Sequence, residues 1–177
     1  MNEILNEYMR LGFSFVLSGA DKKPIGAWKK YQQQHPTEQE VQEWANQLSK
    51  DPSLGINVVC GRISQNLLLI DFDSKDQQFI KAVMGLPIDT LAQNTWVSET
   101  PHGYHIHFLV DGNVELQNAN YILISEGESK KEVDLKGEGG LTKEPPSPSY
   151  TNLSAPNSVS KISKKDYEIL VQKLELL

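Results

Sequence analysis

Two aspartates follow the most apolar run of the chain. Residues 67–70 read Leu-Leu-Leu-Ile, and Asp71 and Asp73 come next. Because alternate residues of a strand point to the same face, these carboxylates should emerge side by side where a buried strand leaves the core. Two ionised carboxylates held there repel each other and lose hydration unless a cation compensates them. The pattern therefore predicts a binding site for divalent metal ions.

An Asp-x-Asp pair can also begin a turn or cap the helix that follows it. Here Ser74 and Gln77 have the spacing of a capping box for a helix through residues 79–84, which Gly85 and Pro87 end. With Ser74 as the expected N-cap, the two aspartates are not needed for capping. This favours the metal-binding interpretation.

Asp134 is the best candidate for a third carboxylate. Its neighbours Val133 and Leu135 are apolar, so its side chain should leave the opposite face of a short strand, just before a glycine-rich turn at 137–140. Mg²⁺ and Mn²⁺ prefer carboxylate oxygens, and a third acid would complete a site for two ions. The alternative is an exposed residue of an edge strand. Lys136 should share the face of Asp134. The alternative interpretation of this lysine is a solvated surface charge.

Two histidines alternate with apolar residues in the strand predicted over 105–110. His105 and His107 should therefore lie on one face, with their apolar neighbours toward the core. An exposed sheet face would explain this pattern. The preceding turn at Gly103 and Tyr104, however, permits close approach of a ligand, and an imidazole there could donate to a phosphate oxygen.

Composition limits the class of protein. The 177 residues, 38% hydrophobic and 23% charged, favour one soluble domain over 1–177, and no segment has the roughly 20 apolar residues of a membrane span. The N-terminal residues do not resemble a secretory signal, so we expect a cytoplasmic location and no membrane partner. A net charge of −6 argues against a protein that coats nucleic acid nonspecifically.

The expected elements alternate between helices and short strands. Helices are predicted over 2–11, over 37–48 behind a Thr37–Glu40 capping box, and over 163–177 behind Ser163. Strands are expected at 13–17, 56–60, 67–73, 95–98, 105–110 and 132–135, with hairpins joining 56–60 to 67–73 and 95–98 to 105–110. The predicted fold is α+β, with a mainly antiparallel sheet flanked by helices.

Several patterns together resemble the primase-polymerase (prim-pol) branch of the archaeo-eukaryotic primase superfamily, which occurs on plasmids, phages and other mobile elements. The resemblance covers about residues 12–150. In chain order, the matching patterns are Lys-Pro at 23–24 with Trp28, a threonine-led helix at 37–44, a strand closing in glycine at 55–61, the acidic motif at 69–73, Gly-x-His at 103–108, the third acid within 133–137, and Pro-Pro-Ser at 145–147.

This resemblance implies an RRM-like catalytic sheet with an N-terminal α/β unit and a DNA polymerase or primase activity. Asp71, Asp73 and Asp134 would hold two Mg²⁺ or Mn²⁺ ions, and His105 would contact the triphosphate of an incoming (d)NTP. DNA template and primer would be the other substrates.

Three further positions are candidates for nucleotide binding. They are Gly103 and Tyr104 in the turn, and Lys136 as a point charge.

The chain also departs from the pattern of this family. His107 stands where the family usually has an aromatic residue, and the sequence contains neither zinc-binding cysteines nor helicase motifs. De novo priming in the family commonly needs an accessory helical domain. We therefore expect primer extension rather than primer synthesis, with a helicase or helical priming domain on a longer chain or a separate protein.

Two other functions compete with the polymerase hypothesis. His105-Ile106-His107 is a His-hydrophobic-His sequence, as in rolling-circle nucleases and relaxases, for which Tyr167 would be the nucleophile. That hypothesis leaves the three aspartates without a role. The other is a non-catalytic nucleotide- or DNA-binding module, which would keep three carboxylates that only repel one another.

Overall fold

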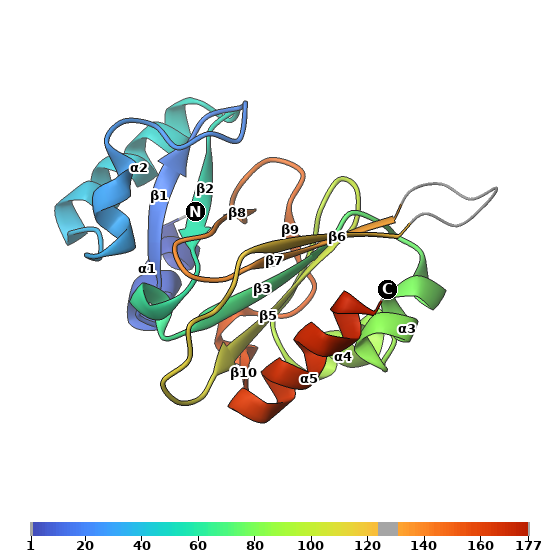
Figure 1. Cartoon of the computed structure of the whole chain (residues 1–177). Helices are drawn as coiled ribbons and strands as arrows, with labels where there is room; N and C mark the ends of the chain where they lie inside the picture. The colour runs from blue at the N-terminus through green and yellow to red at the C-terminus, as the bar shows by residue number, and fades with distance from the viewer. Residues whose placement is uncertain (1, 124–130, 177) are drawn as a thin grey trace.

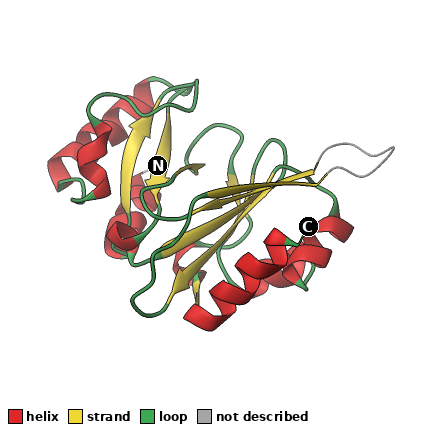
Figure 2. Ribbon diagram, viewed as in Figure 1, coloured by secondary structure: helices red, strands yellow, loops and turns green. Residues whose placement is uncertain are grey.

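Two largely antiparallel sheets, with helices packed against them, make up the part of the chain that the computed structural model describes, residues 2–123 and 131–176 (Figures 1 and 2). The larger sheet carries the predicted acids and histidines. The smaller one belongs to an N-terminal layer beside it. The predicted α+β class with a mainly antiparallel sheet is confirmed.

The larger sheet has the strand order β6-β7-β3-β5-β4-β9, and β10 pairs with β5 as its one parallel neighbour. Its central strand, β3, is the apolar run that ends at the acids. The strands are β3 (Leu67–Phe72), β4 (Val97–Glu99), β5 (Tyr104–Val110), β6 (Ala119–Leu123), β7 (Lys131–Lys136), β9 (Thr151–Asn152) and β10 (Ser160–Ile162). The predicted hairpin between β4 and β5 is confirmed.

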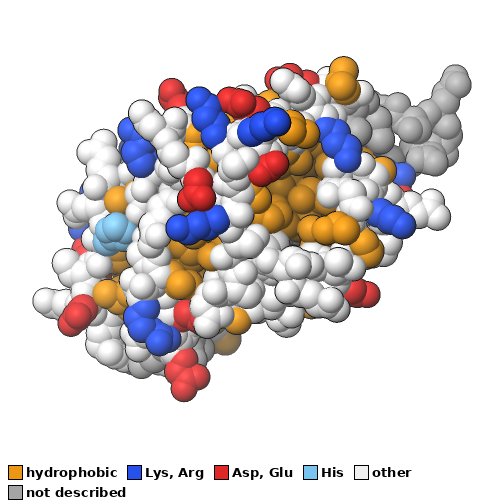
Figure 3. All heavy atoms as spheres, turned by 90° about the horizontal axis from the view of Figure 1, so that it is seen from below, with side chains coloured by type: hydrophobic (Ala, Val, Ile, Leu, Met, Phe, Trp, Pro, Cys, Tyr) orange, Lys and Arg blue, Asp and Glu red, His pale blue; other side chains and the backbone are white. Residues whose placement is uncertain are grey.

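Three helices cover one face of the larger sheet: α3 (Gln77–Met84), α4 (Ile88–Asn94) and α5 (Lys164–Glu175). They lie beneath the sheet in Figure 1 and bury its apolar residues in one core. Seen from that side, hydrophobic side chains are still visible between scattered lysines and acids (Figure 3). Because side chains alternate along a strand, the acids must lie on the opposite face.

An N-terminal layer covers part of that opposite face. It contains α1 (Asn2–Arg10), α2 (Glu38–Lys50) and the three-stranded sheet β1-β2-β8, in which β8 returns from late in the chain. Its strands are β1 (Ser14–Ser18), β2 (Gly55–Val59) and β8 (Leu141–Glu144), and short 3₁₀ turns are η1 (Trp28–Gln32), η2 (Arg62–Ser64) and η3 (Pro156–Ser158). Leu67 and Leu69 of β3 pack in the core of this layer. Asp71 lies farther along the same face, beyond the cover.

The predicted hairpin between residues 56–60 and 67–73 is wrong. A single bridge, between Gly61 and Leu67, joins the two segments. β2 pairs with β1 and β8 in the smaller sheet, whereas β3 belongs to the larger sheet. Gly61 has a φ of +91°, a region that favours glycine, and it turns the chain out of the smaller sheet. The chain therefore changes sheets at the point where a hairpin was expected.

The predicted cap of α3 is also wrong. Asp76 is the N-cap residue, and its carboxylate accepts hydrogen bonds from the backbone of Gln78 (2.9 Å) and Phe79 (3.1 Å). Ser74 instead accepts from the backbone nitrogen of Asp76 in the preceding turn. The helix begins at the acid because a carboxylate can satisfy two free N–H groups at once. Neither Asp71 nor Asp73 is used for capping.

Candidate active site

Asp71, Asp134 and His105 form a row across three adjacent strands. In the registers of the sheet, Asp71 of β3 lies directly opposite Asp134 of β7 on one side and His105 of β5 on the other. Side chains directly opposite each other share a face and have Cβ atoms about 4.5–5.5 Å apart. The structure thus brings together two of the predicted acids and the predicted histidine, from three segments that lie 29 to 63 residues apart in the sequence.

Asp73 comes just after β3, where its backbone nitrogen donates to the carbonyl of Glu132 (3.0 Å). Its side chain joins those of Asp71, Asp134 and His105 around one hollow of about 200 Å³. The remaining wall is formed by Lys22, Thr100, Pro101, His102, Glu132 and Tyr150. All three predicted metal ligands therefore reach the same open space.

The turn between β4 and β5 is held against the end of β3 at Gly103. A Cβ atom there would lie 1.7 Å from the carbonyl oxygen of Phe72 and 2.7 Å from the nitrogen of Ser74. Thr100 closes the turn, since its hydroxyl accepts from the nitrogen of Gly103 (2.9 Å). The predicted close approach is therefore made by the protein's own backbone rather than by a ligand.

Tyr104 lies outside the hollow. It alternates with His105 along β5, so its side chain is on the helix-covered face, where it packs against the core and accepts a long hydrogen bond from Gln77 (3.4 Å). Because the pleat places neighbouring residues on opposite faces, Tyr104, which was predicted to bind the nucleotide, does not line the hollow that His105 lines.

Lys136 lies on the same face as Asp134, as predicted. Its Nζ is 2.6 Å from Oδ2 of Asp134, and Asn120 of β6 donates to the other carboxylate oxygen. Both oxygens of Asp134 thus have polar partners from the protein. The lysine supplies positive charge beside the acids.

His105 connects the open acids to a buried carboxylate that the sequence did not indicate. Its Nε2 lies 3.3 Å from Oδ1 of Asp71, and its Nδ1 lies 2.6 Å from Oε1 of Glu144. Glu144 is on β8 of the smaller sheet and is fully buried. Glu144 stands in a charged run, Lys143-Glu144, that resembles an exposed loop. The strand pairing of β8 with β2 places it inside.

His107 contacts the same carboxylate. It shares the face of His105, as predicted, but it is fully buried rather than on an exposed sheet face, because the N-terminal layer covers it. Its Nε2 lies 2.9 Å from Oε1 of Glu144, and its ring stacks on Trp96 with centroids 3.5 Å apart. It is a structural neighbour of the site.

Burial and neighbouring charges shift the pKa values of His105, His107 and Glu144. Burial alone would lower the pKa of His105, but the charge of Glu144 and hydrogen bonds with Asp71 and Glu144 outweigh it and raise this pKa to about 10. Burial would raise the pKa of Glu144, whereas its interactions with His107 and His105 lower it well below its usual range. For His107, burial dominates and lowers the pKa. A charged imidazole thus lies between two carboxylates.

Tyr150 is another residue of the site that sequence reasoning missed. Its ring centroid is 5.8 Å from that of His105. Burial, together with the charges of Asp71 and Glu144, raises the pKa of its phenol to about 12. The side chain stays neutral at physiological pH and forms an aromatic wall of the hollow.

Two groups of side chains have the donor atoms that a metal ion needs. Asp71, Asp73 and Asp134 offer oxygen ligands to an open hollow, which suits Mg²⁺ or Mn²⁺. The donor atoms of His105, His107 and Glu144 lie within 4.8 Å of one another, so this buried group could also hold a metal ion. Its nitrogen and oxygen atoms are, however, already at hydrogen-bond distances.

The tyrosine that the nuclease hypothesis requires does not lie near the histidines. Tyr167 of α5 is buried on the helix-covered side of the sheet, and its hydroxyl accepts from the backbone nitrogen of Gln117 (3.0 Å). The sheet separates it from His105 and His107. The apolar helical face indicated this core position.

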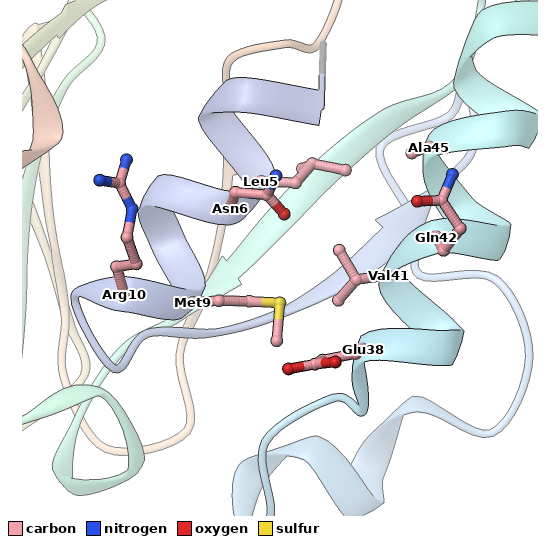
Figure 4. A pocket seen from close by; sticks show the side chains of 8 residues that line it. All are labelled: Leu5, Asn6, Met9, Arg10, Glu38, Val41, Gln42 and Ala45. Atoms are coloured by element: carbon pink, nitrogen blue, oxygen red, sulfur yellow. The ribbon is translucent and has the colours of Figure 1, made fainter.

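A separate hollow of about 410 Å³ lies between α1 and α2 (Figure 4). It is lined by Leu5, Asn6, Met9, Arg10, Glu38, Val41, Gln42 and Ala45. It is larger than the hollow at the acids, but its charged groups, Arg10 and Glu38, do not form a cluster with chemistry of its own. The hollow at the acids is therefore the candidate active site.

Comparison with known proteins identifies the family of the chain. Among the helices of residues 2–123 and 131–176, none combines the length and hydrophobicity that a bilayer crossing requires. A search of curated proteins finds no significant match to the chain. The family model described as "Bifunctional DNA primase/polymerase, N-terminal" matches residues 5–169, which is nearly the whole sequence and includes every residue of the hollow. The chain therefore belongs to the prim-pol family of DNA primase/polymerase domains.

Proposed function

We propose that this chain catalyses template-directed transfer of a nucleotide from a (d)NTP to the 3′-hydroxyl of a DNA primer, in the replication of a plasmid, phage or other mobile element. The observation that carries the proposal is the pairing of Asp71 with both Asp134 and His105 on neighbouring strands, beside Asp73. Family membership supports DNA and nucleotides as substrates.

Asp71, Asp73 and Asp134 would hold two Mg²⁺ or Mn²⁺ ions. Two of these carboxylates already attract positive charge from the protein, since Asp134 contacts Lys136 and Asp71 contacts His105. When bound, such ions lower the pKa of the primer hydroxyl and neutralise charge that develops on the leaving pyrophosphate.

The chain's own side chains bind and orient the nucleotide. The Nε2 of His105 is beside Asp71 at the edge of the hollow, where it can donate to a phosphate oxygen. Lys22 on the wall and Lys136 beside Asp134 add positive charge for the triphosphate. The primer oxygen then forms a bond to the α-phosphorus as the bond to pyrophosphate breaks.

Primer extension is the reaction that we assign to this domain. A helicase or a helical priming domain, on a longer chain or a separate protein, would act with it for primer synthesis. The two reactions are distinguished by adding (d)NTPs to a template with and without a primer.

The decisive experiment uses a labelled primer on a template, dNTPs and Mn²⁺ or Mg²⁺. The wild-type protein should extend the primer stepwise, and Asp71→Ala/Asp73→Ala should lose on the order of 10³-fold or more of the rate, because charge stabilisation in the transition state is lost. Asp89→Asn is the matched control. Asp89 is an exposed acid on α4 that does not line the hollow, so this variant should extend normally.

Other outcomes identify the competing functions. A labelled strand that is cut and covalently attached to the protein would support the nuclease. Binding of DNA or nucleotide without extension would support a non-catalytic module. Normal extension by the double variant would overturn the proposed roles of the acids.

A further inference from the structure

The carboxylate of Glu144 is the most unusual charged group in the part of the chain that the structure describes. It is fully buried, and one oxygen, Oε1, is shared by His105 Nδ1 (2.6 Å), His107 Nε2 (2.9 Å) and the hydroxyl of Thr142 (3.1 Å). Its other oxygen is buried without a hydrogen-bond partner among the described residues. Burying a carboxylate is costly, and well-packed apolar residues are often as stable or more so.

The geometry of this cluster favours hydrogen bonds over metal ligation. Ligand atoms bound at about 2.0–2.1 Å to a tetrahedral ion lie roughly 3.3 Å from one another. The two nitrogen-to-oxygen distances at Glu144, 2.6 and 2.9 Å, are shorter than this. The imidazole and carboxylate groups would have to move apart to admit an ion, in a region where His107 and Glu144 have no exposure.

The cluster determines how His105 is oriented. Glu144 accepts from Nδ1, which leaves Nε2 on the side of Asp71 and the open hollow. The other atoms around Glu144 are themselves held in place. His107 is stacked on Trp96 and has its Nδ1 3.2 Å from the carbonyl of that residue, while Thr142 is on the same strand as Glu144.

Glu144 also links the two sheets. It is on β8 of the smaller sheet, and both histidines are on β5 of the larger one. Any shift of the N-terminal layer relative to the larger sheet would therefore change the orientation of the His105 ring. A carboxylate that orients a metal-bound histidine in this way typically affects activity or affinity by about 10–100-fold, and we expect an effect of the same size for His105.

We propose that Glu144 is a positioning residue, which holds the imidazole of His105 so that Nε2 faces the phosphates of the incoming nucleotide. The proposal rests on the proposed function, because it assigns Glu144 a role in the same reaction. Glu144 touches neither substrate nor metal and acts only through His105.

The test is a double-mutant cycle in primer extension. Glu144→Gln should lower kcat/KM for dNTP by about 10–100-fold, and His105→Ala should lower it by at least as much. If Glu144 acts through His105, adding Glu144→Gln to His105→Ala should cause little further loss. Multiplicative losses would overturn the proposal, because they indicate a merely structural role.

Two further variants separate positioning from stability. Thr142→Val removes only the hydroxyl that contacts Glu144 and the Nδ1 of His105, and it should lower kcat/KM a few-fold, again only when His105 is present. Glu40→Gln breaks the ion pair between Glu40 of α2 and Lys30 of η1, away from the hollow. It should lower stability without changing kcat/KM.

A spectroscopic measurement is independent of activity. In the wild-type protein, imidazole ¹⁵N spectra should show a protonated, hydrogen-bonded Nδ1 for His105, and Glu144→Gln should change that signal. An unchanged signal, or one stoichiometric transition-metal ion in the purified protein, would overturn the proposal. If the wild-type protein does not extend primers, the proposed function fails, and the spectra still decide whether Glu144 orients the ring.

Discussion

The two carboxylates that contact His105 differ in environment. The side chain of Asp71 is 30% exposed and lies 3.3 Å from Nε2, whereas the side chain of Glu144 is fully buried and lies 2.6 Å from Nδ1. One imidazole thus separates an open acidic hollow from a closed polar cluster. The open side is accessible to the proposed ions and substrate, and the closed side is not.

The difference shows that the exposed carboxylates and the buried carboxylate are stabilised in different ways. Carboxylates at the hollow keep part of their hydration, so their repulsion is tolerable until a cation arrives. The buried carboxylate has to be compensated by the protein itself, here by His105, His107 and Thr142. Variants on the two sides should therefore affect different properties.

The largest expected effect is the loss of stability from Glu144→Ala. Removing one partner of a buried ion pair leaves an uncompensated charge on His105 and a cavity, at a cost of about 3–5 kcal/mol in the free energy of unfolding. Asp71→Ala should change that free energy by about 1 kcal/mol or less, because its side chain is partly hydrated. Urea denaturation followed by tryptophan fluorescence gives both values. Equal losses would remove the distinction between the two sides.

Gly103→Ala should destabilise the fold beside the hollow, because the new methyl group would collide with the backbone of β3. The new methyl group would overlap the carbonyl of Phe72, and relief of this overlap requires the turn to move away from β3, at about 1–3 kcal/mol or more. Gly19→Ala is the control, since its methyl group would meet the side chain of Asp21 at 3.0 Å and, in an ordinary contact, the carbonyl oxygen of Lys23 at 3.8 Å. Denaturation of both variants, with primer extension, measures the difference. Equal stability would show that the turn accommodates a side chain.

Metal ions should stabilise the wild-type protein. Ions at about 100 times their Kd should add about 2.7 kcal/mol, or about 5–10 °C in Tm for a chain of this size. Asp71→Ala/Asp134→Ala should lose this shift and Glu144→Gln should keep it, if binding belongs to the open side. Differential scanning fluorimetry with Mn²⁺, Mg²⁺ and EDTA tests this. A shift that depends on Glu144 instead would place the ion in the buried cluster.

Lys136→Met should have a smaller, two-part effect. The Nζ of Lys136 is 2.6 Å from Asp134, so its removal should tighten ion binding while weakening contact with the triphosphate. We expect KM for dNTP to rise about 10-fold, equivalent to about 1.4 kcal/mol, at saturating Mn²⁺. Lys173→Met on the exposed side of α5 is the control. An unchanged KM would limit Lys136 to its ion pair.

The smallest effect concerns acid sensitivity away from the site. Hydrogen bonds from Lys30, the backbone of Thr37 and Tyr31 lower the pKa of Glu40 from 4.5 to about 2. A depressed pKa stabilises the fold above pH 4.5, and this contribution is lost as the pH falls toward 2. Glu40→Gln should flatten the stability curve in that window, by about 1 kcal/mol, as for a lost helix cap. Unfolding measured between pH 2 and 7 checks this. An unchanged curve would assign the acid sensitivity to other carboxylates.

Part of the site was predictable because its residues follow local patterns. The apolar run before Asp71 required a buried strand, and the alternation around Asp134 and His105 placed them on the faces where the structure has them. The capping box at Thr37 and Glu40 was correctly predicted as well. Tyr104, which was predicted to bind the nucleotide, lies on the face opposite His105, as the same alternation requires.

Elements without a periodic signal were missed. The short helix α4 and the strands β6, β8, β9 and β10 are too short, or too polar, to show a repeat in the sequence. Ser74 was predicted as a cap because its spacing to Gln77 fits a capping box, yet Asp76 competes for the same N–H groups. Sequence spacing alone does not decide which of two nearby capping residues forms the N-cap.

Strand composition and side-chain alternation, which act over a few residues, were enough to predict the strands and the faces on which the acids and the histidine lie. The pairing of β3 with both β5 and β7, and the return of β8 beside β2, depend on contacts between segments far apart in the chain. Those long-range contacts alone bring Asp134 to Asp71 and bury Glu144 against His105, because burial is a property of the packed sheets and not of the residues around Glu144 in the sequence.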